Sequence, residues 1–83
     1  MKPQKIYPNT FKETTTIEYE LIRESSVSID LLDITGRHLE VLTNDNLQPG
    51  TYKKTLSVDQ PGVYFLVFRM DEEILTKQIV KIK

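Results

Sequence analysis

The chain has 83 residues, no Cys, no Trp and a formal net charge of −1. Its length allows one domain with one core and no deep enzyme cavity, and the lack of Cys excludes disulfides and thiolate metal sites. Because acidic and basic residues nearly balance, there is no electrostatic basis for binding nucleic acid or anionic lipid.

The amino-acid usage favours strands. There is no Ala, the best helix former, whereas Ile, Val and Thr together supply 23 residues. The basic start of the chain lacks the apolar segment of a signal peptide. The longest apolar run, Val63–Phe68, is far shorter than the ~20 residues that span a bilayer. We therefore expect either a cytoplasmic protein or a piece of a longer exported protein.

Alternating apolar and polar residues predict the first strands. Thr14–Leu21 puts its apolar side chains on one face and Glu18 and Glu20 on the other, and Val27–Leu31 repeats the alternation. The alternation slips around Asp33, which indicates a bulge or the end of a strand.

A turn is predicted after this strand, and Gly36 is expected to adopt a positive φ in it. Arg37–Leu42 predicts a short strand of mixed phase. Thr43–Asn46 has the composition of a turn, so we expect the chain to reverse there.

The same short motif occurs twice, as QPGTY (Gln48–Tyr52) and as QPGVY (Gln60–Tyr64). Proline suits the second position of a type II turn, and glycine accepts the positive φ of the third. Each turn is expected to lead into a strand whose first inward residue is the tyrosine. Because one strand separates the two turns, we expect them at opposite ends of the domain. The turn residues are Pro49, Gly50, Pro61 and Gly62.

Two further strands, Val63–Met70 and Ile74–Lys83, complete the series and are joined by a hairpin. Six or seven short strands with turns about every 8–12 residues and no helix indicate an all-β protein. We predict an immunoglobulin-like antiparallel β-sandwich of about seven short strands. A small barrel is the alternative.

The residues that carry chemistry do not form a recognisable catalytic or metal site. His38 is expected to be an exposed imidazole at a strand edge, and no serine suggests a triad with it. The acidic residues around Asp30, Asp33, Asp45 and Asp71 are expected in ordinary solvated turns, since their spacing is not that of a calcium loop. We therefore expect no enzymatic activity and no cofactor.

Two surface features leave alternatives open. Val63–Phe68 is apolar on both faces, so Phe65 and Val67 either lie under the N-terminal segment or form an exposed patch for a partner. Cover by Ile6 and Tyr7 is the simpler expectation. Three lysines share one face of the last strand and serve either as edge protection or as a basic tag. They are Lys77, Lys81 and Lys83.

The series of motifs closely resembles one family, the C-terminal sorting domain of the type IX (Por) secretion system of certain Gram-negative bacteria. No single motif is specific to the family. The order and spacing of the full series, together with the basic strand at its end, are specific. The resemblance covers the chain from about Ile6 to Lys83. The motifs are YPNTF, TTIEYEL, VSIDLLDITGRHLEVL, LQPGTY, PGVYFLVF and TKQIVKIK.

The resemblance implies a seven-stranded sandwich joined to an N-terminal cargo domain, so residues 1–83 would be one sorting domain with residues 1–12 as linker or lead-in to the first strand. The cargo would enter the periplasm by its own signal peptide and then pass the type IX translocon to the cell surface or the medium. An outer-membrane shuttle protein would recognise the domain, and a sortase-like peptidase would remove it.

The family's motifs carry over to individual positions. Its Pro-Asn-Pro segment falls on Pro8, Asn9 and Thr10, where threonine departs from the pattern, and its Asp-x-x-Gly-Arg turn falls on Asp33, Gly36 and Arg37. The implied recognition residues are Gly62, Tyr64, Phe65, Val67, Lys77, Val80, Lys81 and Lys83.

Other interpretations remain open. The alternative function is a generic immunoglobulin-like spacer or binding module of a cell-surface protein. An edge strand read by a partner also allows strand exchange between two chains, which would give a dimer.

Overall fold

The computed structural model describes the backbone of residues 2–83 and the side chains of residues 5–83; Met1, where the expected domain begins, lies outside the described residues. The described chain folds into eight strands and contains no helix. The strands are β1 (Lys2–Tyr7), β2 (Thr10–Phe11), β3 (Thr15–Leu21), β4 (Ser25–Asp33), β5 (His38–Leu47), β6 (Gly50–Leu56), β7 (Gly62–Met70) and β8 (Glu73–Lys81).

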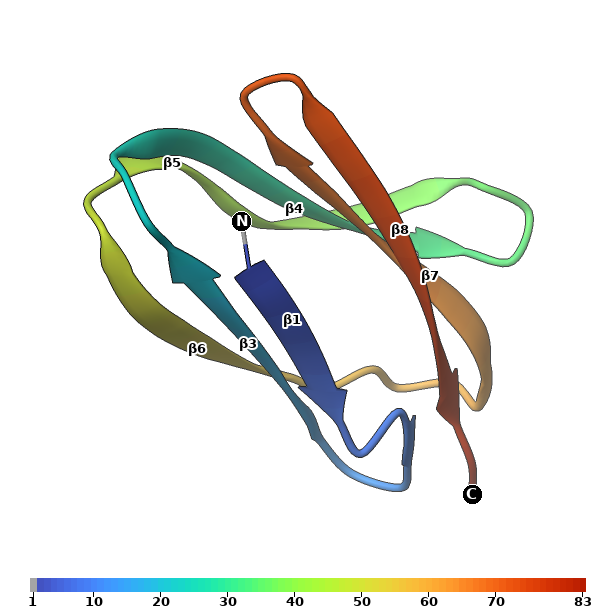
Figure 1. Cartoon of the computed structure of the whole chain (residues 1–83). Helices are drawn as coiled ribbons and strands as arrows, with labels where there is room; N and C mark the ends of the chain where they lie inside the picture. The colour runs from blue at the N-terminus through green and yellow to red at the C-terminus, as the bar shows by residue number, and fades with distance from the viewer. Residues whose placement is uncertain (1) are drawn as a thin grey trace.

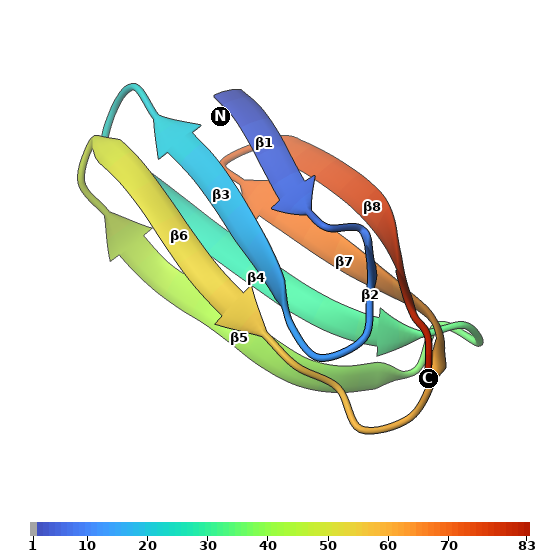
Figure 2. The ribbon, with the colours of Figure 1, turned by 90° about the horizontal axis from the view of Figure 1, so that it is seen from below.

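The strands form two sheets that pack face to face (Figures 1 and 2). One sheet has the order β1-β3-β6, and the other has the order β2-β8-β7-β4-β5. This is the immunoglobulin arrangement, in which strands A, B and E face strands G, F and C. The predicted all-β sandwich is confirmed, with eight strands instead of seven and one parallel pair, β2 with β8.

The core lies between the two sheets because side chains alternate along each strand. The inward positions of β3, β4 and β7 are apolar at every second residue, as the alternation predicted. The buried apolar residues are Phe11, Ile17, Tyr19, Leu21, Val27, Ile29, Leu31, Leu42, Leu56, Tyr64, Leu66, Phe68, Met70 and Ile79.

Both QPGxY motifs lie where the chain passes from one sheet to the other. β5 belongs to the five-stranded sheet, β6 to the three-stranded sheet and β7 again to the five-stranded sheet. Figure 1 shows the two connections at opposite ends of β6, as expected. Gly50 and Gly62 have φ values of 151° and 149°. These values are positive, as predicted, but they lie far from the roughly +80° of a type II turn.

Two assignments along the chain differ from expectation. β5 continues through Thr43–Asn46, where a turn was predicted, because these residues pair with Ser26–Ile29 of β4. The segment expected as linker or lead-in contains two strands, one in each sheet, since β1 pairs with β3 and β2 pairs with β8.

The turn after β4 is built around Asp33. Its Oδ1 accepts hydrogen bonds from the Thr35 hydroxyl (2.6 Å), the Arg37 amide (2.9 Å) and the Thr35 amide (3.0 Å). The Thr35 hydroxyl contributes most to lowering the pKa of Asp33. Burial, the next largest effect, opposes it, and the two backbone amides and the Arg37 charge lower the pKa further. Gly36 has a φ of 89°, as predicted. The strand therefore ends at Asp33, and its register against β5 already shifts between Ile29 and Leu32.

Candidate recognition surface

The pairing of β7 with β8 brings most of the proposed recognition residues together. Gly62 lies opposite Lys81, and Phe65 lies opposite Gln78, three positions along. Val80 lies opposite Val63, next to this pair. These residues lie where β7 begins and β8 ends, which is called the C-terminal end below.

The recognition residues divide between two faces of the sheet. Tyr64 and Leu66 are buried, so the residues of β8 directly opposite them also face the core side. Lys77 is one of these residues, because it lies opposite Leu66. Lys81 is on the same side and is half-buried, whereas Lys77 is exposed. Phe65 and Val67 lie on the outer face. The predicted shared face is therefore correct for Lys77 and Lys81, although it is the inner face, whereas Lys83 lies beyond the end of β8.

The N-terminal segment does not cover the outer face, contrary to the simpler expectation. β1 belongs to the other sheet, where Ile6 lies opposite Ile17 and packs against the core. Tyr7 is 42% exposed, and its hydroxyl donates a 3.0 Å hydrogen bond to Glu18. That bond is the largest cause of the raised pKa of Tyr7.

Five half-buried apolar residues line the outer face of the five-stranded sheet, and no described strand lies over them. Val63 pairs with Val80, and Phe65 pairs with Leu32. We call this group the outer apolar band. It consists of Leu32, Val63, Phe65, Val67 and Val80.

A charged cluster borders this band and was missed by the sequence analysis. Asp30 lies in the middle of β4 with 8% exposure, not in a solvated turn. Arg69 Nη1 donates a 2.8 Å hydrogen bond to its Oδ2, and His38 Nε2 lies 3.5 Å from its Oδ1. The signal in the sequence is Asp30 between Ile29 and Leu31, on the outward phase of a strand. His38 is exposed at the start of edge strand β5, as expected.

The predicted turn at Pro8 and Asn9 attaches the N-terminal segment to both sheets. The carbonyl of Pro8 accepts a 2.6 Å hydrogen bond from the Thr15 hydroxyl, and the carbonyl of Asn9 accepts a 2.8 Å bond from the Val80 amide. The carbonyl of Phe11 accepts a third bond from the Ile82 amide, also 2.8 Å. The end of β8 is thus held between β7 and β2.

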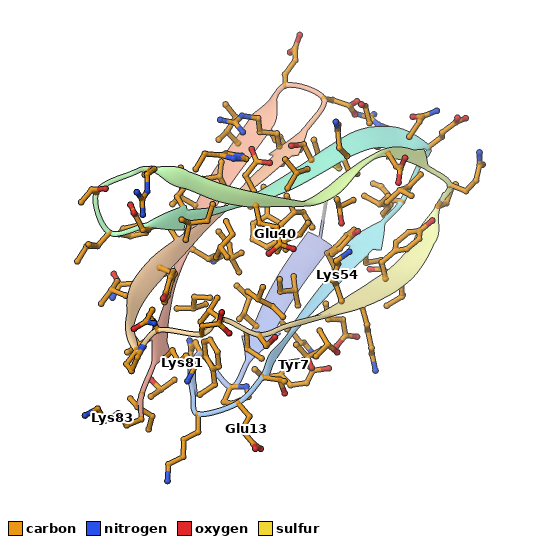
Figure 3. The ribbon with its side chains drawn as sticks, turned by 180° about the vertical axis from the view of Figure 1, so that it is seen from behind. Tyr7, Glu13, Glu40, Lys54, Lys81 and Lys83 are labelled. Atoms are coloured by element: carbon orange, nitrogen blue, oxygen red, sulfur yellow. The ribbon has the colours of Figure 1, made fainter. Side chains whose placement is uncertain are left out.

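No acidic partner of Lys77, Lys81 or Lys83 is found within the part of the chain that the structure describes. The ion pairs there join Arg23 to Asp71, Arg37 to Asp33, and Arg69 and His38 to Asp30. Figure 3 shows Lys81 and Lys83 at the same end of the sandwich. Three cations are therefore available to an external acidic group.

The C-terminal end also holds a hollow with a volume of about 400 Å³, between the turn after β4 and the loop before β7. Leu31, Val58 and Tyr64 supply its apolar lining, and Arg37 and Glu40 its charged lining.

Comparison with known proteins assigns the family. A family model described as the secretion system C-terminal sorting domain matches residues 5–83. Searches of curated proteins and of solved structures gave no significant match. No helix of the described chain is long and apolar enough to cross a membrane. Because the family model spans nearly the whole chain, this protein belongs to the secretion system C-terminal sorting domains, which act as type IX sorting signals on proteins exported to the cell surface or the medium.

Proposed function

We propose that the type IX machinery reads this sorting signal at the C-terminal end and along the outer apolar band. An outer-membrane shuttle protein binds the domain, the translocon passes the cargo from the periplasm, and a sortase-like peptidase then separates the domain from the cargo. The turns at Pro8, Asn9, Asp33, Gly36 and Gly62 hold this end in shape. The turn at Pro49 and Gly50 lies at the other end.

The observation that carries the proposal is the set of three lysines without an acidic partner. A charge that has no internal partner gains more from an external carboxylate than one already paired. Lys77 and Lys81 lie on the same side of β8, and Lys83 follows two residues after the strand ends, so an acidic surface of the shuttle protein meets all three at the end of the chain. Such contacts weaken as salt concentration rises.

The outer apolar band supports the same proposal. Phe65 and its neighbours lie beside the paired Asp30 and Arg69, which supply a polar rim. Apolar residues with a polar rim are typical of protein–protein contacts. We infer that the band supplies affinity and that the lysines supply orientation.

We also propose that the domain is a recognition module without catalytic activity or cofactor. The imidazole of His38 lies against a carboxylate that Arg69 already binds. This arrangement joins β4, β5 and β7, which is a structural role. We further propose that β8 can be exchanged between two chains, because the exchanged strand would make the same pairs with β7 of the second chain.

A reporter assay tests the function. Residues 1–83 are joined to the C-terminus of a fluorescent reporter with a signal peptide, in a type IX-competent strain and in one without the translocon. We expect reporter at the surface or in the medium only in the competent strain. Reporter held in the periplasm of both strains would favour the spacer or binding-module alternative.

A charge variant tests the recognition surface. Replacing Lys77, Lys81 and Lys83 by Gln is expected to leave most of the reporter in the periplasm. The matched control replaces Lys12, Lys53 and Lys54, which removes the same charge outside β8. Equal export of both variants would contradict the role of the lysines, without affecting the assignment of the domain as a signal.

A further inference from the structure

The hollow at the C-terminal end lies on a side of the sandwich where both sheets end. β5 is the last strand of the five-stranded sheet and β6 the last strand of the three-stranded sheet, and Figure 2 shows them on the same side. The start of β5 and the loop after β6 form the two walls of the hollow. No further strand of residues 2–83 covers this side, so the hollow is open to a partner.

A β-bulge at Leu39 shapes the apolar wall of the hollow. Leu31 pairs with Glu40 and Leu32 pairs with His38, which leaves Leu39 without a partner on β4. An extra residue of this kind changes the direction of nearby side chains. Leu39 lines the hollow and is 42% exposed, so part of its apolar surface stays in contact with water.

Two carboxylates without partners lie beside this apolar wall. Glu40 pairs with the buried Leu31, so it lies on the inner side of β5, and Figure 3 shows it pointing toward the other sheet. Asp59 lines the hollow from the loop after β6. Neither carboxylate makes a hydrogen bond or an ion pair with another side chain of residues 5–83.

The other two charged groups of the hollow neutralise each other. Arg37 Nε lies 3.2 Å from Asp33 Oδ2. The charges of Glu40 and Asp59 are therefore left without compensation. Apolar walls strengthen the field of charges of one sign and concentrate counter-ions between them. The hollow thus favours a cation.

We propose that the hollow binds one basic side chain, lysine or arginine, of a partner protein. The methylene stem of this side chain lies against Leu39, Val58 and Tyr64, and its charged end lies at Glu40 and Asp59. Long basic side chains bury such stems on apolar surface while the charge stays near water.

Other occupants fit the lining less well. An acidic group would meet two uncompensated carboxylates, and an apolar side chain would remove them from water without supplying a partner. A calcium ion takes about six to eight oxygen ligands. No group of three or more acidic, histidine or cysteine side chains in the described chain could hold a metal ion.

Under the proposed function, on which the identity of the partner rests, this partner is the shuttle protein. Lys81 and Lys83 lie at the same end of the sandwich as the hollow and carry the opposite charge. A partner that brings an acidic group to the lysines and a basic side chain to the hollow therefore fits in one orientation only.

Titration of the purified chain with capped peptides tests the site. The probes are acetyl-Gly-Arg-Gly-amide and acetyl-Gly-Lys-Gly-amide, and the control peptides carry glutamate or norleucine at the central position. At low salt we expect saturable NMR shifts of the Leu39, Glu40 and Asp59 amides with the basic peptides alone. Norleucine supplies the stem without the charge. Equal shifts with the norleucine peptide, or no saturation with the basic peptides, would overturn the proposal.

Removal of charge tests the two carboxylates. Glu40→Gln combined with Asp59→Asn is expected to weaken binding of the basic peptides ~3- to 10-fold, because exposed ion pairs are individually weak. The matched control, Glu13→Gln with Glu72→Gln, removes the same charge from exposed positions outside the hollow and is expected to bind like the native chain. Equal weakening in both double variants would mean that net charge alone attracts the peptides, and the site would be refuted.

The reporter assay separates this site from the proposed function. The double variant of Glu40 and Asp59 is expected to leave more reporter in the periplasm than its control does. Unchanged export of a variant that no longer binds the peptides would exclude the shuttle protein as the partner. Failure of the native chain to export the reporter would instead refute the proposed function, and saturable binding of the basic peptides would still support the site.

Discussion

Tyr52 and Tyr64 explain why the same five-residue motif occurs twice. The hydroxyl of Tyr52 donates to the Gln48 carbonyl and that of Tyr64 donates to the Gln60 carbonyl, both at 2.5 Å. Each tyrosine thus bonds back across its own Pro-Gly turn, as in the tyrosine corner of immunoglobulin domains. The surroundings differ, because Tyr64 is buried whereas Tyr52 is half-buried and stacks on Tyr19 with ring centroids 5.5 Å apart.

Removing each tyrosine hydroxyl in turn measures how much each of the two corners contributes to stability. Tyr64→Phe is expected to lower the free energy of unfolding by ~1 kcal/mol, the usual net value of a hydrogen bond. Tyr52→Phe is expected to cost about half as much, because water replaces the bond at this exposed hydroxyl. Urea unfolding of both variants measures the difference. A larger loss for Tyr52→Phe would show that the stacked pair holds the more important corner.

Asp33 makes stability depend on pH. Its pKa is lowered in the folded state, first by the Thr35 hydroxyl. A lowered folded pKa contributes stability above the unfolded pKa of ~3.9, and this stability is lost as pH falls through the folded value. Asp33→Asn is therefore expected to be less stable than the native chain at pH 5–7, with the gap closing below about pH 4. A gap that stays constant down to pH 2 would contradict this account of Asp33.

At the scale of elements, alternation predicted the strands that have one buried face, such as β3 and the first part of β4, because burial fixes which residues are apolar. It could not predict β2, whose two residues are too few for a pattern. It also missed the second half of β5, where Asn44 and Asn46 favour a turn locally. That edge strand has little to bury, and pairing with β4, together with a 2.6 Å bond from Asn46 to Glu24, holds it extended.

The candidate site could also be predicted only in part, because some of its contacts follow from local sequence and others depend on long-range pairing. The register of β7 against β8 follows from the hairpin, so the grouping of Gly62 with Lys81 was within reach of the sequence. The position of β1 in the other sheet depends on long-range pairing, which leaves no local signal. The same holds for Asp30, whose partners Arg69 and His38 come from two other strands.

Phe11 shows how much a two-residue strand contributes. Its side chain is 2% exposed and packs in the core, and its carbonyl accepts a hydrogen bond from the amide of Ile82, just after β8. Phe11→Ala is expected to cost ~3–5 kcal/mol of unfolding free energy, a large part of the total for a small domain. Phe11→Leu keeps most of the volume and is expected to cost less than about 1.5 kcal/mol. Similar urea midpoints for the two variants would indicate that β2 is dispensable.

At the scale of the whole molecule, the positions of the two chain ends decide which part of the domain stays accessible when a cargo is attached. Figures 1 and 2 show the N-terminal and C-terminal ends of the described chain at opposite ends of the sandwich, which is 38 Å long. β1 starts at the end where β8 also starts, and β8 then runs the length of the domain. A cargo joined to the N-terminus therefore lies far from Lys81 and Lys83, which leaves the C-terminal end open to the export machinery.

This geometry predicts an asymmetry between the two termini. A small folded domain attached before Met1 is expected to leave export of the chain intact, whereas the same domain attached after Lys83 is expected to block it, because it would cover the hollow beside Tyr64 and the three lysines. Neither fusion is expected to change the urea midpoint of the sorting domain, since the buried core residues lie between Phe11 and Ile79 along the chain. Export is measured as surface reporter in the competent strain, with the translocon-deficient strain as the background. Equal export of the two fusions, with both domains folded, would mean that the machinery reads the outer apolar band alone and that the C-terminal end contributes only to stability.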